Sequence, residues 1–387
     1  MAKGNLLSLS HQLSFMSECF LHFDSSTNNR DLLYLSGFTA PDPFIYLKVD
    51  GMESLFVSRM EHGRAEEESK IADVRVFPAI GRSDSKFDYY KKVMMQVLTE
   101  ARSSDLEVRV TPSFPSFLYQ ELKDENYNVE IDYSTIQDMR VIKSSEEVSC
   151  IEDVQRKAEL ALREVVKSLE GSREKGEYLV RDDELVTSEG LRFILESGLL
   201  KQGCHALETI VSCGSLSANP HYRGEGPIRV GQPIVIDLFP RSESTMYYAD
   251  ITRTFVVGKP DTELVDMYET VREAQEAAFR TLSAGVSGYE VHNEVCDHFE
   301  GKGYKTLRSG AEEGFIHGTG HGLGLEIHER PYLAPGGEIL ARQNVVTVEP
   351  GLYYKDVGGV RIEDLVVITK KGYKNLTGFE KRLEVEL

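Results

Sequence analysis

The chain has 387 residues and a formal net charge of −19, with 41% hydrophobic and 28% charged residues. A chain of this length is too long to fold around one ordinary hydrophobic core, which predicts two domains. The composition is typical of a soluble globular protein. The negative charge repels phosphate backbones and anionic lipid, which argues against nucleic acid or a membrane surface as a partner. There is no apolar run of membrane-spanning length, and the first 13 residues lack the apolar segment of a secretory signal, so we expect a cytoplasmic protein.

The five cysteines are odd in number, scattered along the chain and free of any Cys-x-x-Cys pair. This usage predicts reduced thiols, mostly buried, and argues against a zinc site made of thiolates.

The first part of the chain, residues 1–143, predicts alternating strands and helices. Asp50-Gly51, between two apolar runs, is a typical hairpin turn. The expected strands cover residues 18–23, 44–49, 54–58, 74–77 and 107–111, and the expected helices cover 87–102 and 116–122. No residue here has catalytic spacing, so we predict a small α/β or α+β domain with a structural role.

A second domain is predicted over residues 144–387. It begins with a long helix whose N-cap is Ser144 or Ser145, with glutamates in the first turn. Its buried face is marked by apolar residues at helical spacing: Ile151, Val154, Ala158, Leu162, Val165 and Leu169. Further helices are expected at 182–199, 262–283 and 288–301, and strands at 207–213, 233–238, 247–257, 345–348 and 360–368. The predicted fold class is α+β, with antiparallel hairpins covered by helices.

Two acidic residues flank the polar link 240–245 in the first of these hairpins. The midpoint between Asp237 and Asp250 falls inside this link. We therefore predict that the two side chains face each other across the ladder, with Cβ atoms about 5 Å apart. Carboxylates held so close repel each other unless cations lie between them.

A second hairpin repeats this arrangement. Glu349 and Glu363 are equally distant from Asp356, which precedes the turn signal Gly358-Gly359. Strand alternation places Arg361 on the same side as Glu363. One such pair is weak support for a site, but two pairs beside Val/Ile-rich runs argue for buried acids.

The densest signal is a glycine-rich segment with three histidines, His317, His321 and His328. The spacing of His317 and His321 is found in zinc-binding helices, but four glycines between residues 318 and 324 argue against a helix. A glycine-rich loop instead lets the backbone come close to a ligand or a metal. His221, in a turn before the first acidic hairpin, is a weaker candidate and would on its own be read as a surface histidine.

Four carboxylates and one imidazole suit a pair of divalent cations. The carboxylates supply four negative charges against the four positive charges of two ions, and a neutral imidazole adds a ligand without changing this balance. The predicted ligands are Asp237, Asp250, His321, Glu349 and Glu363.

Four motifs, in this order, resemble those of the pita-bread metallopeptidases, and most closely the Xaa-Pro aminopeptidase/prolidase branch. They are Asp-Ile-Thr-Arg-Thr at 250–254, His-Gly-Thr-Gly-His-Gly-Leu-Gly at 317–324, Val-Glu-Pro-Gly-Leu-Tyr at 348–353 and Gly-Val-Arg-Ile-Glu-Asp at 359–364. The resemblance covers the whole chain. It implies a creatinase-like α/β domain at residues 1–143 followed by a pita-bread catalytic domain at 144–387.

The resemblance also implies a role for each site residue. Asp250 and Glu363 would bridge two ions, with the other three ligands completing the coordination. His221 and His328 correspond to histidines that contact the substrate carbonyl and the tetrahedral intermediate. His317 and Arg361 correspond to groups beside the ligands or the substrate.

The activity implied is hydrolysis of the bond before proline at the N-termini of short peptides, with Glu349 as proton shuttle. Mn²⁺ or Co²⁺ suits the oxygen-rich ligand set best, and Zn²⁺ or Fe²⁺ stays open. We favour an Xaa-Pro aminopeptidase. A dipeptidase (prolidase) stays open, because prolidases often carry an arginine after the last histidine, where this chain has Arg330 and, two residues on, Tyr332.

A non-catalytic pita-bread module that binds a protein is a remote alternative, since such relatives lose ligands and all five are present here. Members of the family commonly self-associate, so a homodimer is expected. The link 238–249 is longer than in many relatives, and its role is open.

Overall fold

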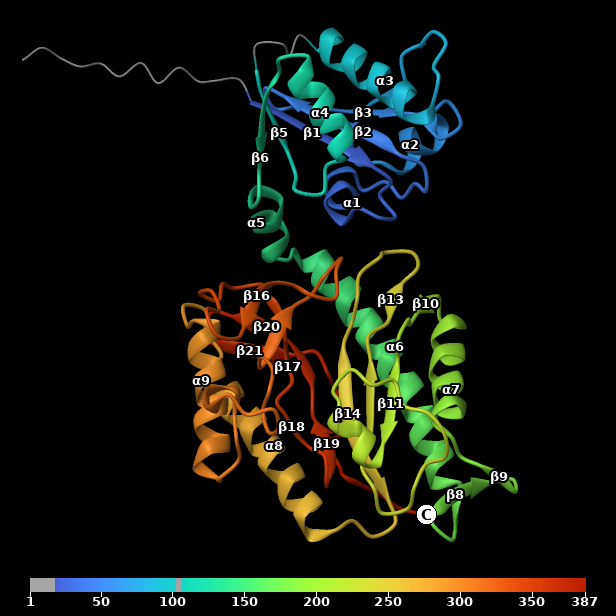
Figure 1. Cartoon of the computed structure of the whole chain (residues 1–387), viewed down its shortest axis with the longest axis vertical. Helices are drawn as coiled ribbons and strands as arrows, with labels where there is room; N and C mark the ends of the chain where they lie inside the picture. Colours follow the sequence, from blue (N-terminus) through green and yellow to red (C-terminus); the bar gives the residue numbers. More distant parts are fainter. Residues whose placement is uncertain (1–17, 102–105) are drawn as a thin grey trace, which may run out of the picture. The chain divides into compact units, whose positions relative to one another are not determined.

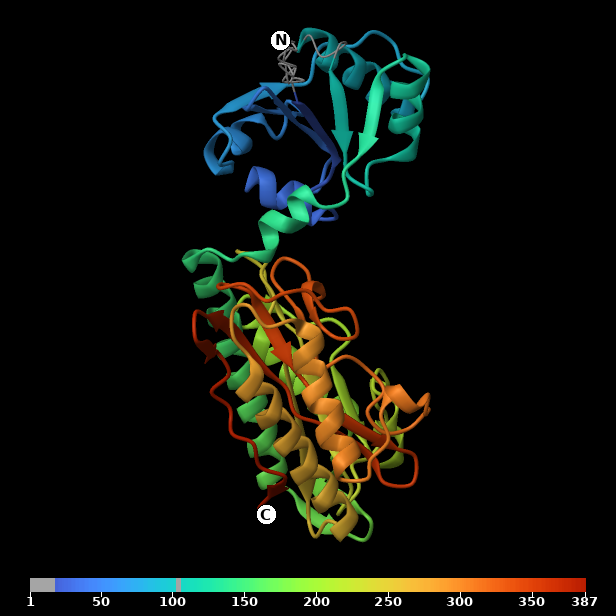
Figure 2. The same cartoon turned by 90° about the vertical axis from the view of Figure 1, so that its left-hand side faces the viewer.

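The computed structural model describes residues 18–101 and 106–387 (Figures 1 and 2). The chain divides into two compact units, one ending at Gln137 and the other beginning at Asp138. The predictions made for the first 13 residues and for Arg102, the expected end of a helix, lie outside the described residues. Among the residues described, no helix is long and apolar enough to cross a membrane.

The first unit is built on a mixed six-stranded sheet of order β4-β3-β2-β1-β5-β6. The predicted turn at Asp50-Gly51 is confirmed, since both residues have positive φ and join two antiparallel strands. The strands are β1 (Glu18–Asp24), β2 (Phe44–Val49), β3 (Met52–Val57), β4 (Asp73–Val76), β5 (Glu107–Val110) and β6 (Asn128–Ile131). The helices are α1 (Arg30–Ser36), α2 (His62–Glu68), α3 (Lys86–Glu100) and α4 (Ser116–Asp124). All five predicted strands and both predicted helices are present, whereas α1, α2 and β6 were not predicted.

Four long helices dominate the second unit: α6 (Ser145–Glu170), α7 (Ser188–Leu200), α8 (Thr262–Thr281) and α9 (Gly288–Gly301). The short helix α5 (Thr135–Val141) precedes them. Ser144 caps α6 in a reciprocal capping box with Glu147, and the six apolar residues predicted for its inner face are all fully buried.

One helix prediction is wrong at its start. Residues 182–187 are not helical, because Asp182 and Asp183 both have left-handed φ and form the turn between β8 (Tyr178–Arg181) and β9 (Glu184–Leu185).

The second unit has two halves, each a sheet covered by two helices (Figure 1). Helices α6 and α7 pack against the sheet β11-β12-β14-β22, and α8 and α9 pack against strands of the sheet β16-β15-β17-β20-β21 and the hairpin β18-β19. The first sheet contains β11 (Ile210–Cys213), β12 (Ile234–Leu238), β14 (Ile251–Val257) and β22 (Glu384–Val385). The second half contains β15 (Gly320–Gly322), β16 (Glu329–Leu333), β17 (Val345–Val348), β18 (Gly351–Tyr354), β19 (Gly358–Arg361), β20 (Asp364–Thr369) and β21 (Gly372–Asn375). The short strands β7 (Arg173–Lys175), β10 (Cys204–His205) and β13 (Arg241–Ser242) lie outside these sheets.

Strand β14 joins the two halves. The backbone carbonyl of Thr252 accepts a hydrogen bond from the backbone N–H of Glu363 at 3.0 Å, and the hydroxyl of Thr254 bonds both backbone groups of Arg361. Arg253, between them, is fully buried and donates to the Asp364 carboxylate at 2.8 Å and to the carbonyl of Glu363 at 2.5 Å. These hydrogen bonds hold residues 252–254 of the first acidic hairpin against residues 361–364 of the second.

Arg253 also ties in the C-terminal segment. Its guanidinium donates to the backbone carbonyls of Phe379 at 2.7 Å and Glu380 at 3.0 Å, and β22 pairs with β14. The five cysteines are all free thiols, as predicted, and three of them are buried.

Candidate metal centre

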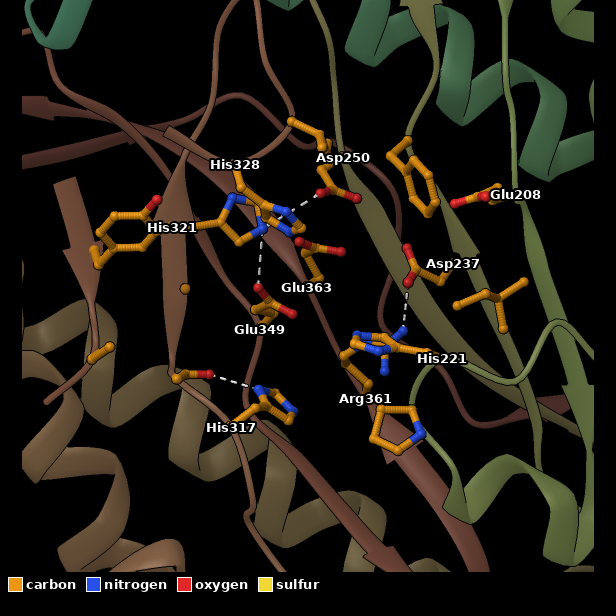
Figure 3. A pocket seen from close by; sticks show the side chains of 18 of the residues that line it. Glu208, His221, Asp237, Asp250, His317, His321, His328, Glu349, Arg361 and Glu363 are labelled. Atoms are coloured by element: carbon orange, nitrogen blue, oxygen red, sulfur yellow. Dashed lines mark hydrogen bonds and ion pairs between the residues drawn. The ribbon is translucent and has the colours of Figure 1, made fainter. Parts of the chain in front are cut away.

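A cavity of about 970 Å³ in the second unit is lined by every residue predicted for the site (Figure 3). These nine residues lie on strands or on the loops beside them. They are His221, Asp237, Asp250, His317, His321, His328, Glu349, Arg361 and Glu363.

The second acidic hairpin has the predicted register. Strand β17 pairs with β20 and β18 with β19 in one continuous register, centred on residue 356. Glu349 and Glu363 lie in the gap between these two ladders, opposite each other in that register. The two glutamates are thereby freed from the ladder and line the cavity.

The predicted register of the first acidic hairpin is wrong. Asp237 lies opposite Thr252, so Asp250 is two residues from the expected position and just outside the ladder. The link 238–249 is not a simple turn, because it contains β13, which pairs with β10. A shift of two residues keeps the same face, and both aspartates therefore still line the cavity.

Three predicted ligands form the tightest group. One ligand atom from each of Asp250, His321 and Glu363 lies within 4.8 Å of the others, and all three residues are buried. Within the described part of the chain, Oδ1 of Asp250 is buried without a hydrogen-bond partner. A buried carboxylate oxygen without a donor is costly unless a cation takes the place of that donor.

The ring of His321 is oriented for ligation through Nε2. Its Nδ1 lies 3.1 Å from the carbonyl oxygen of Gly322, which places a proton on Nδ1. Nε2 then faces Oε1 of Glu349 at 3.2 Å and Oδ2 of Asp250 at 3.8 Å. Thr347 supports this pair, since its hydroxyl accepts from the backbone N–H of His321 and donates to Glu349. A backbone acceptor on one ring nitrogen is the usual way to aim the other at a metal.

Asp237, the remaining predicted ligand, is held by a buried arginine. Arg361 donates from Nη2 to Oδ2 of Asp237 at 2.5 Å and from Nη1 to the hydroxyl of Tyr353 at 2.8 Å. The same hydroxyl lies 3.0 Å from Nε2 of His317. These four side chains form one hydrogen-bonded chain along the cavity wall, which fixes the carboxylate of Asp237.

The carboxylates carry more negative charge than the neighbouring side chains balance. Burial, together with the nearby carboxylates, raises the pKa of Asp250 and of Glu363 well above their usual values. Burial also raises the pKa of Asp237, although Arg361 opposes the change. Burial acts to raise the pKa of Glu349 too, but the hydrogen bond and charge of His321 outweigh it and lower this pKa to about 2. Three carboxyl groups that resist ionisation mark a place that needs positive charge.

The cavity fits a centre for divalent cations. Carboxylate oxygens with one imidazole nitrogen are ligands that Mn²⁺, Co²⁺, Zn²⁺ and Fe²⁺ all accept. The orphaned oxygen of Asp250 and the raised pKa values describe a ligand set built for cations.

Three residues of the site were not predicted. Tyr353 pairs with Gly359, and Gly359 is two residues before Arg361 on the same strand. Strand alternation therefore puts Tyr353 on the same face of the hairpin as Arg361, and this could have been predicted from the sequence. Thr252 donates to Oε2 of Glu363 at 2.8 Å and belongs to a motif already singled out. Glu208, in a loop with left-handed φ, lines the cavity without any pattern in the sequence that indicates it (Figure 3).

Comparisons with known proteins show what the chain as a whole is similar to. Residues 149–370 match metallopeptidase family M24. The Xaa-Pro dipeptidase of Pyrococcus furiosus is 33% identical over 357 residues, which cover 91% of this chain and 92% of that protein. The solved prolidase from Pyrococcus horikoshii OT3 has a TM-score of 0.77 at 29% identity and covers 95% of both chains. The X-Pro aminopeptidase from Thermotoga maritima MSB8 has a TM-score of 0.79 at 26% identity, covering 95% of this chain and 98% of that one.

The fold and the cavity define a metal-dependent hydrolase with the pita-bread architecture. The chain belongs to metallopeptidase family M24, because the family match spans more than half of it and a relative above 30% identity spans nine-tenths of it. The resemblance inferred from the four motifs and the predicted fold class are both confirmed.

Proposed function

We propose that this metallopeptidase is an Xaa-Pro exopeptidase, which hydrolyses the peptide bond before proline at the N-terminus of short peptides. The observation that carries the proposal is the convergence of five residues on one cavity, where a buried carboxylate oxygen of Asp250 has no donor among the residues that the structure describes. The relatives named as Xaa-Pro dipeptidase and X-Pro aminopeptidase support the choice of bond. The five residues that would hold two divalent cations are Asp237, Asp250, His321, Glu349 and Glu363.

Bound divalent cations would supply a water nucleophile of lowered pKa and Lewis acidity for the scissile carbonyl. Mn²⁺ and Co²⁺ suit this oxygen-rich ligand set. Because it lines the cavity, Glu349 can take a proton from the attacking water and deliver it to the proline nitrogen. Among the described residues, the side-chain hydrogen bond from Thr347 and the contact with His321 both involve Oε1 of Glu349, which leaves Oε2 for this transfer.

Two histidines line the same cavity and stabilise the carbonyl oxygen as it becomes negative. His328 is only partly desolvated, and this desolvation, followed by the charge of His321, lowers its pKa, which favours the neutral ring with one N–H donor. His221 lines the cavity from the loop before β12 (Figure 3). An N–H donor placed at the developing oxyanion would stabilise the transition state more than the ground state.

The aminopeptidase activity remains our first proposal. A dipeptidase must hold the free carboxylate of its substrate, and Arg330, the arginine after the last histidine, is already paired with Glu338 at 2.5 Å and Asp138 at 2.6 Å. Arg330 is also not among the residues that line the cavity, whereas Tyr332 is.

A dipeptidase is the second candidate, and one observation favours it beyond the names of the relatives. Arg223 lines the cavity, and its guanidinium is 3.7 Å from Glu196, a loose surface pair that leaves it able to hold a substrate carboxylate.

The test compares Ala-Pro, Ala-Pro-Ala and Ala-Ala-Ala as substrates of the full chain loaded with Mn²⁺. We expect cleavage of Ala-Pro-Ala, none of Ala-Ala-Ala, and loss of turnover in Glu349→Ala with an unchanged circular dichroism spectrum. Exclusive cleavage of Ala-Pro, with a KM raised by Arg223→Gln, would establish the dipeptidase instead. Wild-type turnover in Glu349→Ala would refute the mechanism for both.

A further inference from the structure

Three charged side chains are buried together behind the segment that carries His328. The side chains of Glu329, Lys143 and Arg140 are 3%, 1% and 3% exposed. Lys143 Nζ lies 2.5 Å from Oε1 of Glu329, and Arg140 Nη2 lies 2.5 Å from Oε2. Arg140 also reaches the half-exposed Glu326 at 2.7 Å. Because each carboxylate oxygen of Glu329 has its own cation, the carboxylate cannot turn without breaking a buried ion pair.

Such a cluster is a poor means of stabilising a fold. Desolvation of buried charges offsets most of their attraction, and apolar side chains of similar volume are often equally stabilising. What two cations on one carboxylate do provide is a fixed geometry, since charge-assisted hydrogen bonds are short and directional. Lys143 and Arg140 lie 186 and 189 residues before Glu329 in the sequence. A buried ion cluster that joins such distant segments is better explained by a positioning role than by a gain in stability.

The backbone connects this fixed carboxylate directly to the cavity. Glu329 is the first residue of β16 and is buried, whereas His328, just before it, is exposed and lines the cavity. His328 lies in the bend that ends where β16 begins, one peptide bond from Glu329, so holding Glu329 limits where the backbone of His328 can lie. The loop also packs tightly on the cluster, because a Cβ on Gly324 would lie 2.6 Å from Oε1 of Glu329 and 3.1 Å from Cε of Lys143.

The ring of His328 has little support of its own. It lies edge-on to the ring of His321, with ring centroids 4.3 Å apart and an interplanar angle of 81° (Figure 3). In residues 18–101 and 106–387 no side-chain hydrogen bond to the His328 ring is formed. The placement of this imidazole therefore depends on the backbone beside it.

The cations of the cluster are fixed to the part of the fold that carries Glu349. The backbone N–H of Lys143 donates to the carbonyl of Gln343 at 3.0 Å, and the side-chain amide of Gln343 returns a bond to the carbonyl of Lys143 at 3.2 Å. Asn344 similarly donates to the carbonyl of Val141 at 2.9 Å. Strand β17 begins directly after Asn344 and leads into Glu349. The segment that holds Glu329 is therefore hydrogen-bonded to the residues that precede Glu349.

We propose that Arg140 and Lys143 are positioning residues, which act through Glu329 to hold His328 where it meets the substrate carbonyl. This inference rests on the proposed function for the role given to His328. It adds a clamp formed by the segment just before α6, which no motif of the site contains.

Glu329→Asp tests the clamp, since it keeps the charge and withdraws the carboxylate by one methylene. A misplacement of about 1 Å can cost about 100-fold in rate, so we expect kcat to fall about 10- to 100-fold with KM within about threefold. The matched control is Asp138→Asn. It breaks the ion pair of Asp138 with Arg330, which joins the same two segments at the surface, and should leave kcat within about twofold.

A double-mutant cycle separates positioning from general damage. If the clamp acts through His328, Glu329→Asp should cost no further kcat in the His328→Ala background. An undiminished loss in that background, or wild-type kcat in Glu329→Asp, would overturn the inference. Should Glu329→Asp fail to fold, the pair Lys143→Met with Glu329→Gln replaces it, because that variant removes one charge of each sign.

A nuclear magnetic resonance measurement tests the clamp without relying on activity. The ring C–H signal of His328, assigned with His328→Ala in the full chain, should shift or broaden in Glu329→Asp and stay unchanged in Asp138→Asn. An unchanged signal in Glu329→Asp would overturn the inference. A shifted signal in a protein that cleaves no Xaa-Pro peptide would leave the clamp standing and refute the proposed function alone.

Discussion

Replacing Asp250 by asparagine should stabilise the metal-free protein and at the same time remove its stabilisation by divalent cations. Asp250 lies among buried acids, and its Oδ1 has no donor within the described residues. Asparagine has nearly the same shape and carries no charge. The substitution therefore removes repulsion between acids without leaving a cavity.

The expected magnitude follows from the distance between the acids. Two ionised carboxylates with oxygens no more than 4.8 Å apart repel by at least about 3 kcal/mol at an effective dielectric constant of about 20. Protonation of one acid already relieves part of this in the metal-free protein, so we expect a gain of about 1–2 kcal/mol. For a unit of this size such a gain raises Tm by about 2–8 °C.

Cations should reverse the order of the two proteins. A ligand at 100 times its Kd stabilises the folded state by about 2.7 kcal/mol, or about 5–11 °C in Tm, and Mn²⁺ should do this for the wild type. Asp250→Asn should show little of this shift. Differential scanning calorimetry with and without Mn²⁺ measures both effects.

Asp237→Asn is the matched control, and it should change the Tm of the metal-free protein in the opposite direction. It also neutralises an acid that lines the cavity, but it leaves the buried Arg361 without its carboxylate partner. Removing one partner of such a pair destabilises by about 3–5 kcal/mol, so this variant should lower the metal-free Tm. A lower Tm for metal-free Asp250→Asn, or a full Mn²⁺ shift in that variant, would refute the electrostatic reasoning.

Two further predictions concern buried charge away from the ligands. Arg253→Met leaves Asp364 short of a cation in a fully buried pair and should destabilise by about 3–5 kcal/mol in urea unfolding, whereas the exposed Arg156→Met should change stability by less than about 0.5 kcal/mol. His22 is buried without a hydrogen-bond partner among the described residues, and burial lowers its pKa from 6.5 to about 4. Because only the unfolded chain takes up this proton between pH 6.5 and 4, stability should fall by about 3 kcal/mol over that range and stay lower below it. His22→Leu should remove this increment, and an identical pH dependence in both proteins would contradict the assignment.

Local signals in the sequence were sufficient where several of them agreed. Helix α6 was predicted from an N-cap at Ser144 or Ser145 and an apolar stripe; the structure has Ser144 as the N-cap and buries the stripe. The register about residue 356 was also predictable, since the turn signal near that residue and two flanking strands with Val/Ile runs define one centre, although Gly358 and Gly359 themselves belong to β19. These features depend on neighbours in the chain, which is why a sequence alone reveals them.

Errors arose where distant segments decide the local structure. The link 238–249 was treated as a symmetric turn, but β13 within it pairs with β10, and this moves the centre of the hairpin by one residue. Residues 182–187 resemble a helix start in composition, yet the left-handed Asp182 and Asp183 make a turn there. The clamp on Glu329 has no local pattern at all, because its two cations lie at the start of the unit.

The segment after residue 378 supports the proposed metal centre from behind β14. Carbonyl oxygens of Phe379 and Glu380 hold the guanidinium that also supports Glu363, and β22 covers the outer edge of β14. A proteolytic cut ahead of this segment would expose that edge and take away two acceptors of a desolvated cation. Damage to this segment would thus reach Glu363, a proposed metal ligand, through one side chain, Arg253.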